Sequence, residues 1–129
     1  MDIEGTISNQ NLSILIDIGA TLSYITPKRV EDFHLSKESH AKPWLVQLAT
    51  EEKRKVTDFV ANYEVKIQDH VTRINLNIFP LDSYDTLIGM NWLERHKVIL
   101  NCFDKTFTYV AEHKTIKKLT SISKPVLLR

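Results

Sequence analysis

One carboxylate in the sequence stands where it could do chemistry. Asp17 directly follows the apolar run Leu12–Ile16 and is followed by Gly19 and Ala20. Asp and Gly are common in ordinary turns, so the stretch taken alone favours a structural turn. A carboxylate at the inner end of a buried strand, however, costs free energy unless it has partners or a task. Because Gly19 would also let the chain turn sharply beside a ligand, Asp17 is a candidate catalytic residue.

Peptide hydrolysis by carboxylates needs two of them, one ionised to activate water and one protonated to donate a proton. Neighbouring carboxylates can share a proton and titrate as a pair. The chain has no second Asp-x-Gly-Ala. Its other aspartates lie in polar or turn-like contexts, for example Asp58, Asp69, Asp82 and Asp104. The simplest source of the second carboxylate is therefore Asp17 of another copy of the chain, across a two-fold axis.

The histidines and serines do not form a competing site. The histidines show no i,i+4 pair and no cysteine at ligand spacing, so neither a metal nor another cofactor is expected. They are His34, His40, His70, His96 and His113. Ser23 and Ser83 lack the context of a nucleophilic serine. Trp44 and Trp92 are expected to pack against apolar neighbours rather than to bind a ligand.

The composition predicts one compact domain. The 129 residues are 43% apolar with a net charge of +1, so no global preference for nucleic acid or anionic membranes is expected. The single cysteine, Cys102, favours a reducing environment and a cytoplasmic location, and it is expected to pack as a small apolar side chain. No segment approaches the ~18 apolar residues that span a bilayer. Three lysines near the C-terminus are more simply solvated than bound to nucleic acid: Lys114, Lys117 and Lys118.

Short segments rich in β-branched and aromatic residues, separated by turn residues, predict an all-β, mainly antiparallel fold. The predicted strands are Met1–Ser8, Leu12–Ile16, Leu45–Leu48, Val56–Ile67, Val71–Phe79, Asp85–Ile88, Val98–Asn101 and Thr106–Val110. Two short helices are predicted, over Pro27–Phe33 with Thr26 as N-cap and over Met90–His96 with Asn91 as N-cap. Residues 1–112 are expected to form the domain, and 113–129 a final edge strand or a tether to a neighbouring segment.

Two apolar-and-glycine segments about 70 residues apart carry a resemblance to a known family. Asp17-Ile18-Gly19-Ala20-Thr21 with the downstream Leu87-Ile88-Gly89 resembles the retroviral-type aspartic proteases, or retropepsins. The segment LIGMNWLERH is most similar to the protease region of gypsy-type long-terminal-repeat retrotransposon polyproteins. The resemblance runs from about Ile3 to about Tyr109. It implies a closed retropepsin-like barrel and an endopeptidase of Gag-Pol polyprotein processing, without a cofactor. It also implies a homodimer formed through the active-site loops.

The same resemblance implies roles for individual residues. Three residues after Asp17 would line the cleft that receives an extended polyprotein segment: Gly19, Ala20 and Thr21. Three downstream residues would support the active-site loop from behind: Leu87, Ile88 and Gly89. The hairpin Val46–Val60 would be the flap that covers the substrate. Three residues near its tip would contact the substrate: Ala49, Thr50 and Glu51.

The sequence departs from the family pattern at two places. Ile18 stands where active members usually carry Ser or Thr, whose hydroxyl ties the two active-site loops together across the dimer axis. Packing of Ile18 against its symmetry mate would relieve part of this loss. The flap tip, residues 49–54, also has no glycine. A second interpretation therefore stays open, a retropepsin-like module that binds or dimerises without efficient catalysis. A third is a β-rich ligand-binding domain unrelated to proteases.

Overall fold

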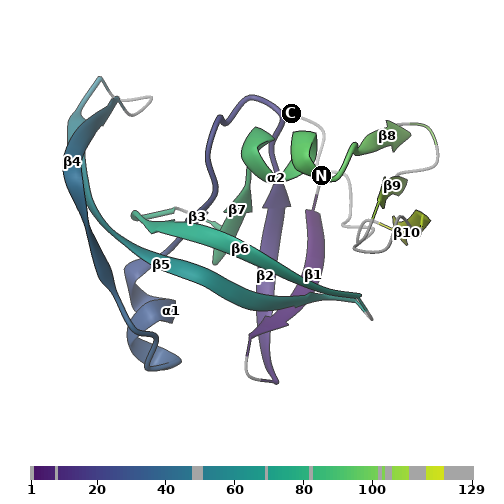
Figure 1. The fold of residues 1–129 in the computed structure, drawn as a ribbon, viewed down its shortest axis with the longest axis horizontal. Helices are drawn as coiled ribbons and strands as arrows, with labels where there is room; N and C mark the ends of the chain where they lie inside the picture. Colours follow the sequence, from purple (N-terminus) through teal and green to yellow (C-terminus); the bar gives the residue numbers. More distant parts are fainter. Residues whose placement is uncertain are drawn as a thin grey trace.

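The computed structural model describes residues 2–7, 9–47, 51–68, 70–81, 83–101, 103, 106–110 and 116–120. Its elements are drawn in Figure 1: β1 (Asp2–Ile7), β2 (Gln10–Ile16), β3 (Tyr24–Ile25), α1 (Pro27–Asp32), β4 (Glu38–Gln47), β5 (Lys53–Ile67), β6 (His70–Ile78), β7 (Thr86–Ile88), α2 (Met90–Arg95), β8 (Ile99–Asn101), β9 (Thr106–Val110) and β10 (Ile116–Thr120). Several residues discussed above lie outside the described ranges: Met1, Ser8, Leu48, Ala49, Thr50, Asp69, Asp82, Cys102, Asp104, His113 and Lys114.

Six strands form a closed barrel. Their order is β1-β2-β7-β3-β6-β5, and Gly5 of β1 pairs with Ile67 of β5 to close the ring. β4 pairs with β5 and adds a seventh strand at the edge. Strands β8, β9 and β10 form a separate antiparallel sheet. The predicted closed, mainly antiparallel all-β barrel with two short helices is therefore confirmed.

Two strand pairs are parallel, although the turn residues predict hairpins. β2 pairs with β7 through Leu15 opposite Leu87, and β3 pairs with β6. Parallel strands need a long connection, so turn signals between neighbouring segments cannot reveal them. Because β2 and β7 run in the same direction, Asp17 and Gly89 leave the sheet at the same edge. The topology thus brings together two segments that are far apart in the sequence.

Some predicted boundaries and caps differ from the structure. β4 begins at Glu38 rather than at Leu45, and β3 was not predicted. Thr26 occupies the N-cap of α1, but its side chain makes no capping hydrogen bond. The N-cap prediction for Asn91 is wrong, because Gly89 occupies that position in α2. β10 lies within residues 113–129, and the division of the chain at residue 112 stays a prediction.

The barrel interior and the two helices share one apolar core. Its members are Ile3, Ile7, Leu12, Ile14, Ile16, Ile25, Val30, Phe33, Leu35, Val60, Val65, Ile67, Ile74, Leu76, Ile88, Trp92 and Leu93. Trp92 is 2% exposed and donates Nε1–H to Thr72 Oγ1 at 2.9 Å, which confirms its predicted packing role. Trp44 lies half-buried in β4, edge-on to the ring of His40.

Thr86 is a buried residue whose hydroxyl has no hydrogen-bond partner among the described residues. An unsatisfied buried hydroxyl destabilises the folded state. We therefore expect Thr86→Val to raise the free energy of unfolding by about 1 kcal/mol in denaturant titrations. Thr72→Val is the matched control, because the Thr72 hydroxyl accepts the Trp92 hydrogen bond, and it should instead destabilise by about 1–2 kcal/mol. Destabilisation by both variants would contradict the assignment of Thr86 as unsatisfied.

Asp85 joins α1 to two barrel strands just before β7. Its Oδ2 accepts hydrogen bonds from Ser13 N at 2.9 Å and Ser13 Oγ at 3.1 Å. Its Oδ1 accepts one from Arg29 Nε at 2.9 Å. Partial burial disfavours the ionised carboxylate, but the bonds from Ser13 and Arg29 outweigh burial and lower the pKa of Asp85. The ionised side chain therefore stabilises the folded state.

We expect Asp85→Asn to lower the free energy of unfolding by about 1–2 kcal/mol at pH 7, because a charge-assisted hydrogen bond is lost. The folded-state pKa is the lower one, so this stabilisation is full above the unfolded-state pKa of about 3.9. It is lost as pH falls through the folded-state pKa. Denaturant titrations from pH 7 to pH 2 should show the two proteins converging. Asp32→Asn touches the same Arg29 at a more exposed position and should cost less than about 0.5 kcal/mol.

Candidate active site

Asp17 lies at the C-terminal end of β2, in a turn that its own side chain helps to form. Its backbone N–H donates to Ile88 O at 2.9 Å, which continues the pairing of β2 with β7. Its Oδ1 accepts a hydrogen bond from Gly19 N at 2.8 Å. Within the described residues, Oδ2 has no hydrogen-bond partner. The turn thus orients the half-buried carboxylate through one oxygen and leaves the other available.

Gly19 and Ala20 belong to this turn. The φ angle of Gly19 is not positive, so conformation alone does not require glycine there. A Cβ at Gly19 would lie 3.1 Å from Asp17 Oδ1, a close contact that a small shift of the carboxylate would relieve. Ala20 N donates to Asp17 O at 3.3 Å and closes the turn.

The segment that follows β7 holds the active-site loop by its backbone. Met90 N donates to Ala20 O at 2.7 Å, and Asn91 N donates to Thr21 O at 3.0 Å. At Gly89 a Cβ would lie 2.2 Å from Leu22 O, a distance that no side chain tolerates. The first turn of α2 therefore packs directly on the loop after Asp17.

The supporting residues predicted from the sequence are thus next to the loop. Ile88 is fully buried and Leu87 half-buried; they pair with Ile16 and Leu15 of β2. Leu87 also pairs with Tyr24 of β3, which follows the active-site loop. Thr21 is exposed at the surface of the loop. The structure brings these residues together around Asp17, and their roles in substrate binding stay predictions.

A buried polar network behind the loop was missed by the sequence analysis. Ser23 is fully buried; its Oγ donates to Asn91 Oδ1 at 2.7 Å and accepts from Gly89 N at 3.1 Å. Asn77 of β6 donates from N and Nδ2 to Ser23 O. The Oδ1 of Asn77 therefore accepts from His40 Nε2 at 2.7 Å. These partners are 37 to 68 residues apart, so no local pattern could reveal them.

The predicted flap corresponds to the hairpin of β4 and β5, which rises at one side of the molecule in Figure 1. Trp44 pairs with Val56. Ala49 and Thr50 lie outside the described residues. Glu51 is exposed and has a φ of 67°, the left-handed conformation that favours glycine. Glu51 thus adopts the kind of backbone that the resemblance leads one to expect of a glycine, with a charged side chain instead.

Ile18 points away from the core and is 64% exposed. It lies between the catalytic candidate and Gly19, at the outer surface of the turn. No hydroxyl stands at this position, so the hydrogen-bonded tie expected for the family has no donor here.

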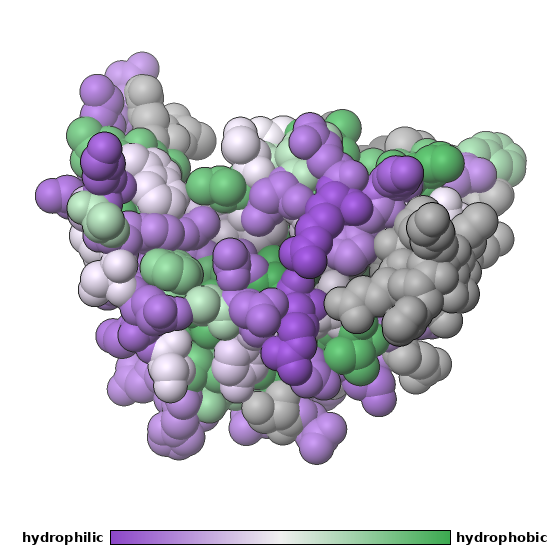
Figure 2. Space-filling model, viewed as in Figure 1, coloured by the Kyte–Doolittle hydropathy of each residue, from purple (hydrophilic) through white to green (hydrophobic). Residues whose placement is uncertain are grey.

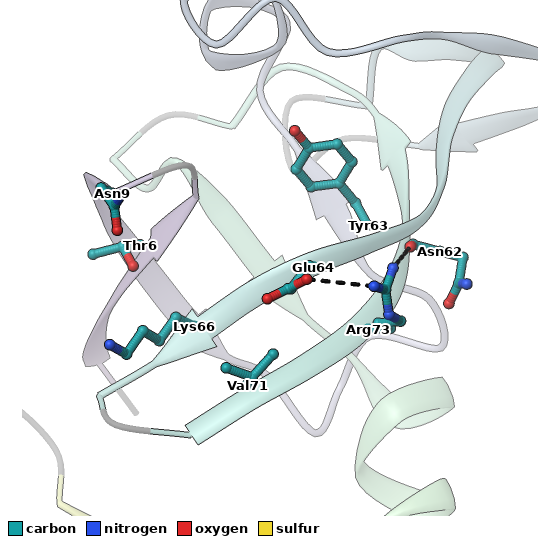
Figure 3. A pocket seen from close by; sticks show the side chains of 8 residues that line it. All are labelled: Thr6, Asn9, Asn62, Tyr63, Glu64, Lys66, Val71 and Arg73. Atoms are coloured by element: carbon teal, nitrogen blue, oxygen red, sulfur yellow. Dashed lines mark hydrogen bonds and ion pairs between the residues drawn. The ribbon is translucent and has the colours of Figure 1, made fainter.

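An open depression on the barrel, shown in Figure 3, is separate from this loop. Its lining comes from β1, β5, β6 and the turn after β1: Thr6, Asn9, Asn62, Tyr63, Glu64, Lys66, Val71 and Arg73. Arg73 pairs there with Glu64 at 3.3 Å and donates to Asn62 O. None of the predicted site residues lines it.

The described residues also contain no cluster of His, Cys, Asp and Glu suited to a metal ion. In that same part of the chain, no helix is both long and apolar enough to cross a membrane.

Comparisons with known proteins agree on the kind of domain. The family model of the retroviral aspartyl proteases matches residues 3–115. Among solved structures, the retroviral protease-like domain of Ddi1 from Leishmania major is similar, with a TM-score of 0.66 and 13% sequence identity. The match covers 92% of this chain and 93% of that one. At this identity the likeness concerns the fold, which is retropepsin-like. No curated protein matches the chain.

Proposed function

The chain belongs to the retroviral aspartyl protease family, and we propose that it is an aspartic endopeptidase that works as a homodimer with one Asp17 from each chain. The observation that carries this proposal is the geometry of Asp17. One carboxylate oxygen is held by the Gly19 amide, and the other has no hydrogen-bond partner among the described residues. One carboxylate cannot act as general base and general acid at the same time. In a two-fold symmetric dimer, Asp17 of the other chain supplies the second carboxylate.

In the proposed reaction the ionised Asp17 takes a proton from water as the water oxygen attacks the peptide carbonyl carbon. The protonated Asp17 of the other chain donates its proton to the carbonyl oxygen, which yields a tetrahedral diol. Collapse of the diol returns a proton to one carboxylate and passes another to the leaving nitrogen. Because one carboxyl must stay protonated, we propose an optimum at acidic to near-neutral pH.

The proposed substrate is an extended peptide. Backbone groups of Gly19, Ala20 and Thr21 would pair with it as an added strand, under the hairpin of β4 and β5. The segment LIGMNWLERH supports the proposal that this peptide substrate comes from a Gag-Pol polyprotein of a gypsy-type retrotransposon. A cytoplasmic location is proposed from the single cysteine.

A second candidate function is a binding or dimerisation module without efficient catalysis. Two observations favour it: Ile18 offers no hydroxyl for a tie between the loops, and Glu51 holds a left-handed backbone near the hairpin tip. Both proposals assume the same fold and the same dimer. They differ in whether Asp17 catalyses peptide cleavage.

The test is incubation of the purified protein with a random peptide library from pH 4 to pH 7, with new peptide ends identified by mass spectrometry. The expected result is a set of cleavages that Asp17→Asn does not produce. Equal cleavage by the wild type and by Asp17→Asn would contradict the proposed endopeptidase activity. A dimeric wild type that cleaves nothing over this pH range would establish the second candidate instead.

A further inference from the structure

The hairpin of β4 and β5 projects from the molecule. In Figure 2 it stands out at the upper left, and a hollow separates it from the surface over α2, which Figure 1 locates. Among the described strands, β4 is an edge strand that pairs only with β5. The position of the hairpin relative to the active-site loop therefore depends on side chains at its base, residues 39–44 of β4 and 56–58 of β5.

The pairing of the two strands is irregular at this base. Ser39 pairs with Asp58 and Trp44 pairs with Val56, so five steps along β4 match two steps along β5. A bulge of this kind bends the strand and redirects the side chains within it, and bulges are frequent next to active sites. His40 lies inside the bulge, and Trp44 lies at its end.

His40 reaches across β5 to β6. Its ring stacks on Phe59 of β5 with ring centroids 4.3 Å apart, and it lies edge-on to Trp44 at 4.7 Å. Its Nε2 lies 2.7 Å from Oδ1 of Asn77, which is 6% exposed. The amide nitrogen of Asn77 donates to the backbone oxygen of Ser23 at 3.2 Å. Because that carbonyl can only accept, the Asn77 oxygen faces His40, and His40 Nε2 carries the proton.

Ser23 continues this connection to the loop of Asp17. Its Oγ accepts a hydrogen bond from Gly89 N at 3.1 Å, in the segment that supports the loop. Tyr24, the next residue, gives a second link to the hairpin base. Burial raises the pKa of the Tyr24 hydroxyl, and its hydrogen bond with Trp44 opposes part of this rise. The base of the hairpin is thus linked to two consecutive residues that lead out of the active-site loop.

We propose that His40 is a positioning residue that holds the base of the hairpin to the active-site loop through Asn77 and Ser23. It acts through these two residues, so it governs how the hairpin holds a substrate and not the proton transfers at Asp17. Its effect on cleavage rests on the proposed endopeptidase function, whereas the hydrogen-bonded connection belongs to the protein without substrate.

NMR of the full chain with ¹⁵N-labelled histidine tests the connection directly. In the neutral ring of His40, the nitrogen shifts should place the proton on Nε2, and that proton should exchange slowly with water because it is hydrogen-bonded inside the protein. A neutral ring with its proton on Nδ1 would contradict the proposal, because Nε2 could then not donate to Asn77.

Variants at the base separate the hydrogen bond from the ring stacking. His40→Phe keeps a ring on Phe59 but removes the donor, and it should raise the population of the open hairpin about tenfold, as measured by NMR relaxation dispersion on residues 44–47. His40→Gln keeps an N–H near the position of Nε2 and should stay within about threefold of wild type. A hairpin that opens as much in His40→Gln as in His40→Phe would rule out the hydrogen bond as its fastening.

Ser39→Ala is the matched control in the same strand. The Ser39 hydroxyl donates to Asp58 Oδ1 at 3.0 Å, a hydrogen bond within the hairpin that does not reach the loop. The open population in Ser39→Ala should therefore stay at the wild-type level. Equal opening in Ser39→Ala and His40→Phe would overturn the role of His40.

Cleavage kinetics test the positioning role. In His40→Phe the KM for a peptide identified from the library should rise about tenfold while kcat stays within about threefold, because the hairpin would hold substrate and transition state alike. Ser39→Ala should change neither. A fall in kcat at constant KM would place His40 in the chemical step instead and contradict the positioning role. If the wild type cleaves nothing, the proposed endopeptidase function fails, and the NMR results still decide whether His40 holds the hairpin.

Discussion

Asp17→Asn is expected to lower the rate of peptide cleavage by about 10³-fold or more while leaving the fold and the dimer intact. An amide cannot accept a proton from water, and general base catalysis contributes ~10²–10⁴ to such reactions. The variant keeps the size of the side chain, and its Oδ1 can still accept the Gly19 hydrogen bond. The measurement is kcat/KM on a peptide identified from the library, with thermal unfolding and sedimentation as controls for folding and assembly.

Mixed dimers sharpen this prediction. If each active site needs Asp17 from both chains, equal amounts of wild type and Asp17→Asn should give about one quarter of the activity expected for all-wild-type dimers of the same total concentration. Sites built within single chains would retain about half. A linear decline of activity with the fraction of wild type would therefore contradict the shared site even if Asp17→Asn itself is inactive.

The local sequence was enough to predict the two strand ends that meet at the candidate site. An apolar run that ends in Asp17 and another that ends in Gly89 both identify strand ends, and their burial in the structure follows from their composition. The parallel pairing that sets them side by side was not predicted, because it links residues about 70 positions apart through no short turn.

Tertiary contacts determine the features that the sequence alone did not predict. β4 begins at Glu38 although Lys42 and Pro43 disfavour a strand. Pairing with β5 holds it, with a register shift between Ser39 and Trp44 that accommodates the proline. The same holds for Ser23, which has no local signature yet becomes the centre of the network behind the loop.

Gly89→Ala is expected to destabilise the protein by about 3 kcal/mol or more and to abolish cleavage. The added Cβ would lie 2.2 Å from Leu22 O and 2.7 Å from Ala20 O, both backbone atoms that cannot rotate away. Relief requires the active-site loop to separate from α2, which breaks the hydrogen bond from Met90 N to Ala20 O. Denaturant titrations and peptide cleavage at the same temperature measure the two effects.

Gly19→Ala is the control variant that identifies why Gly89→Ala destabilises the protein. Its Cβ would meet only the carboxylate oxygen of Asp17 at 3.1 Å, a side-chain atom that can move, and its φ is not positive. It should therefore cost less than about 1 kcal/mol of stability, although it crowds the catalytic candidate. If both alanine variants unfold alike, glycine at position 89 matters for general chain flexibility. If only Gly89→Ala unfolds, the close backbone approach between the loop and α2 is what holds Asp17 in position.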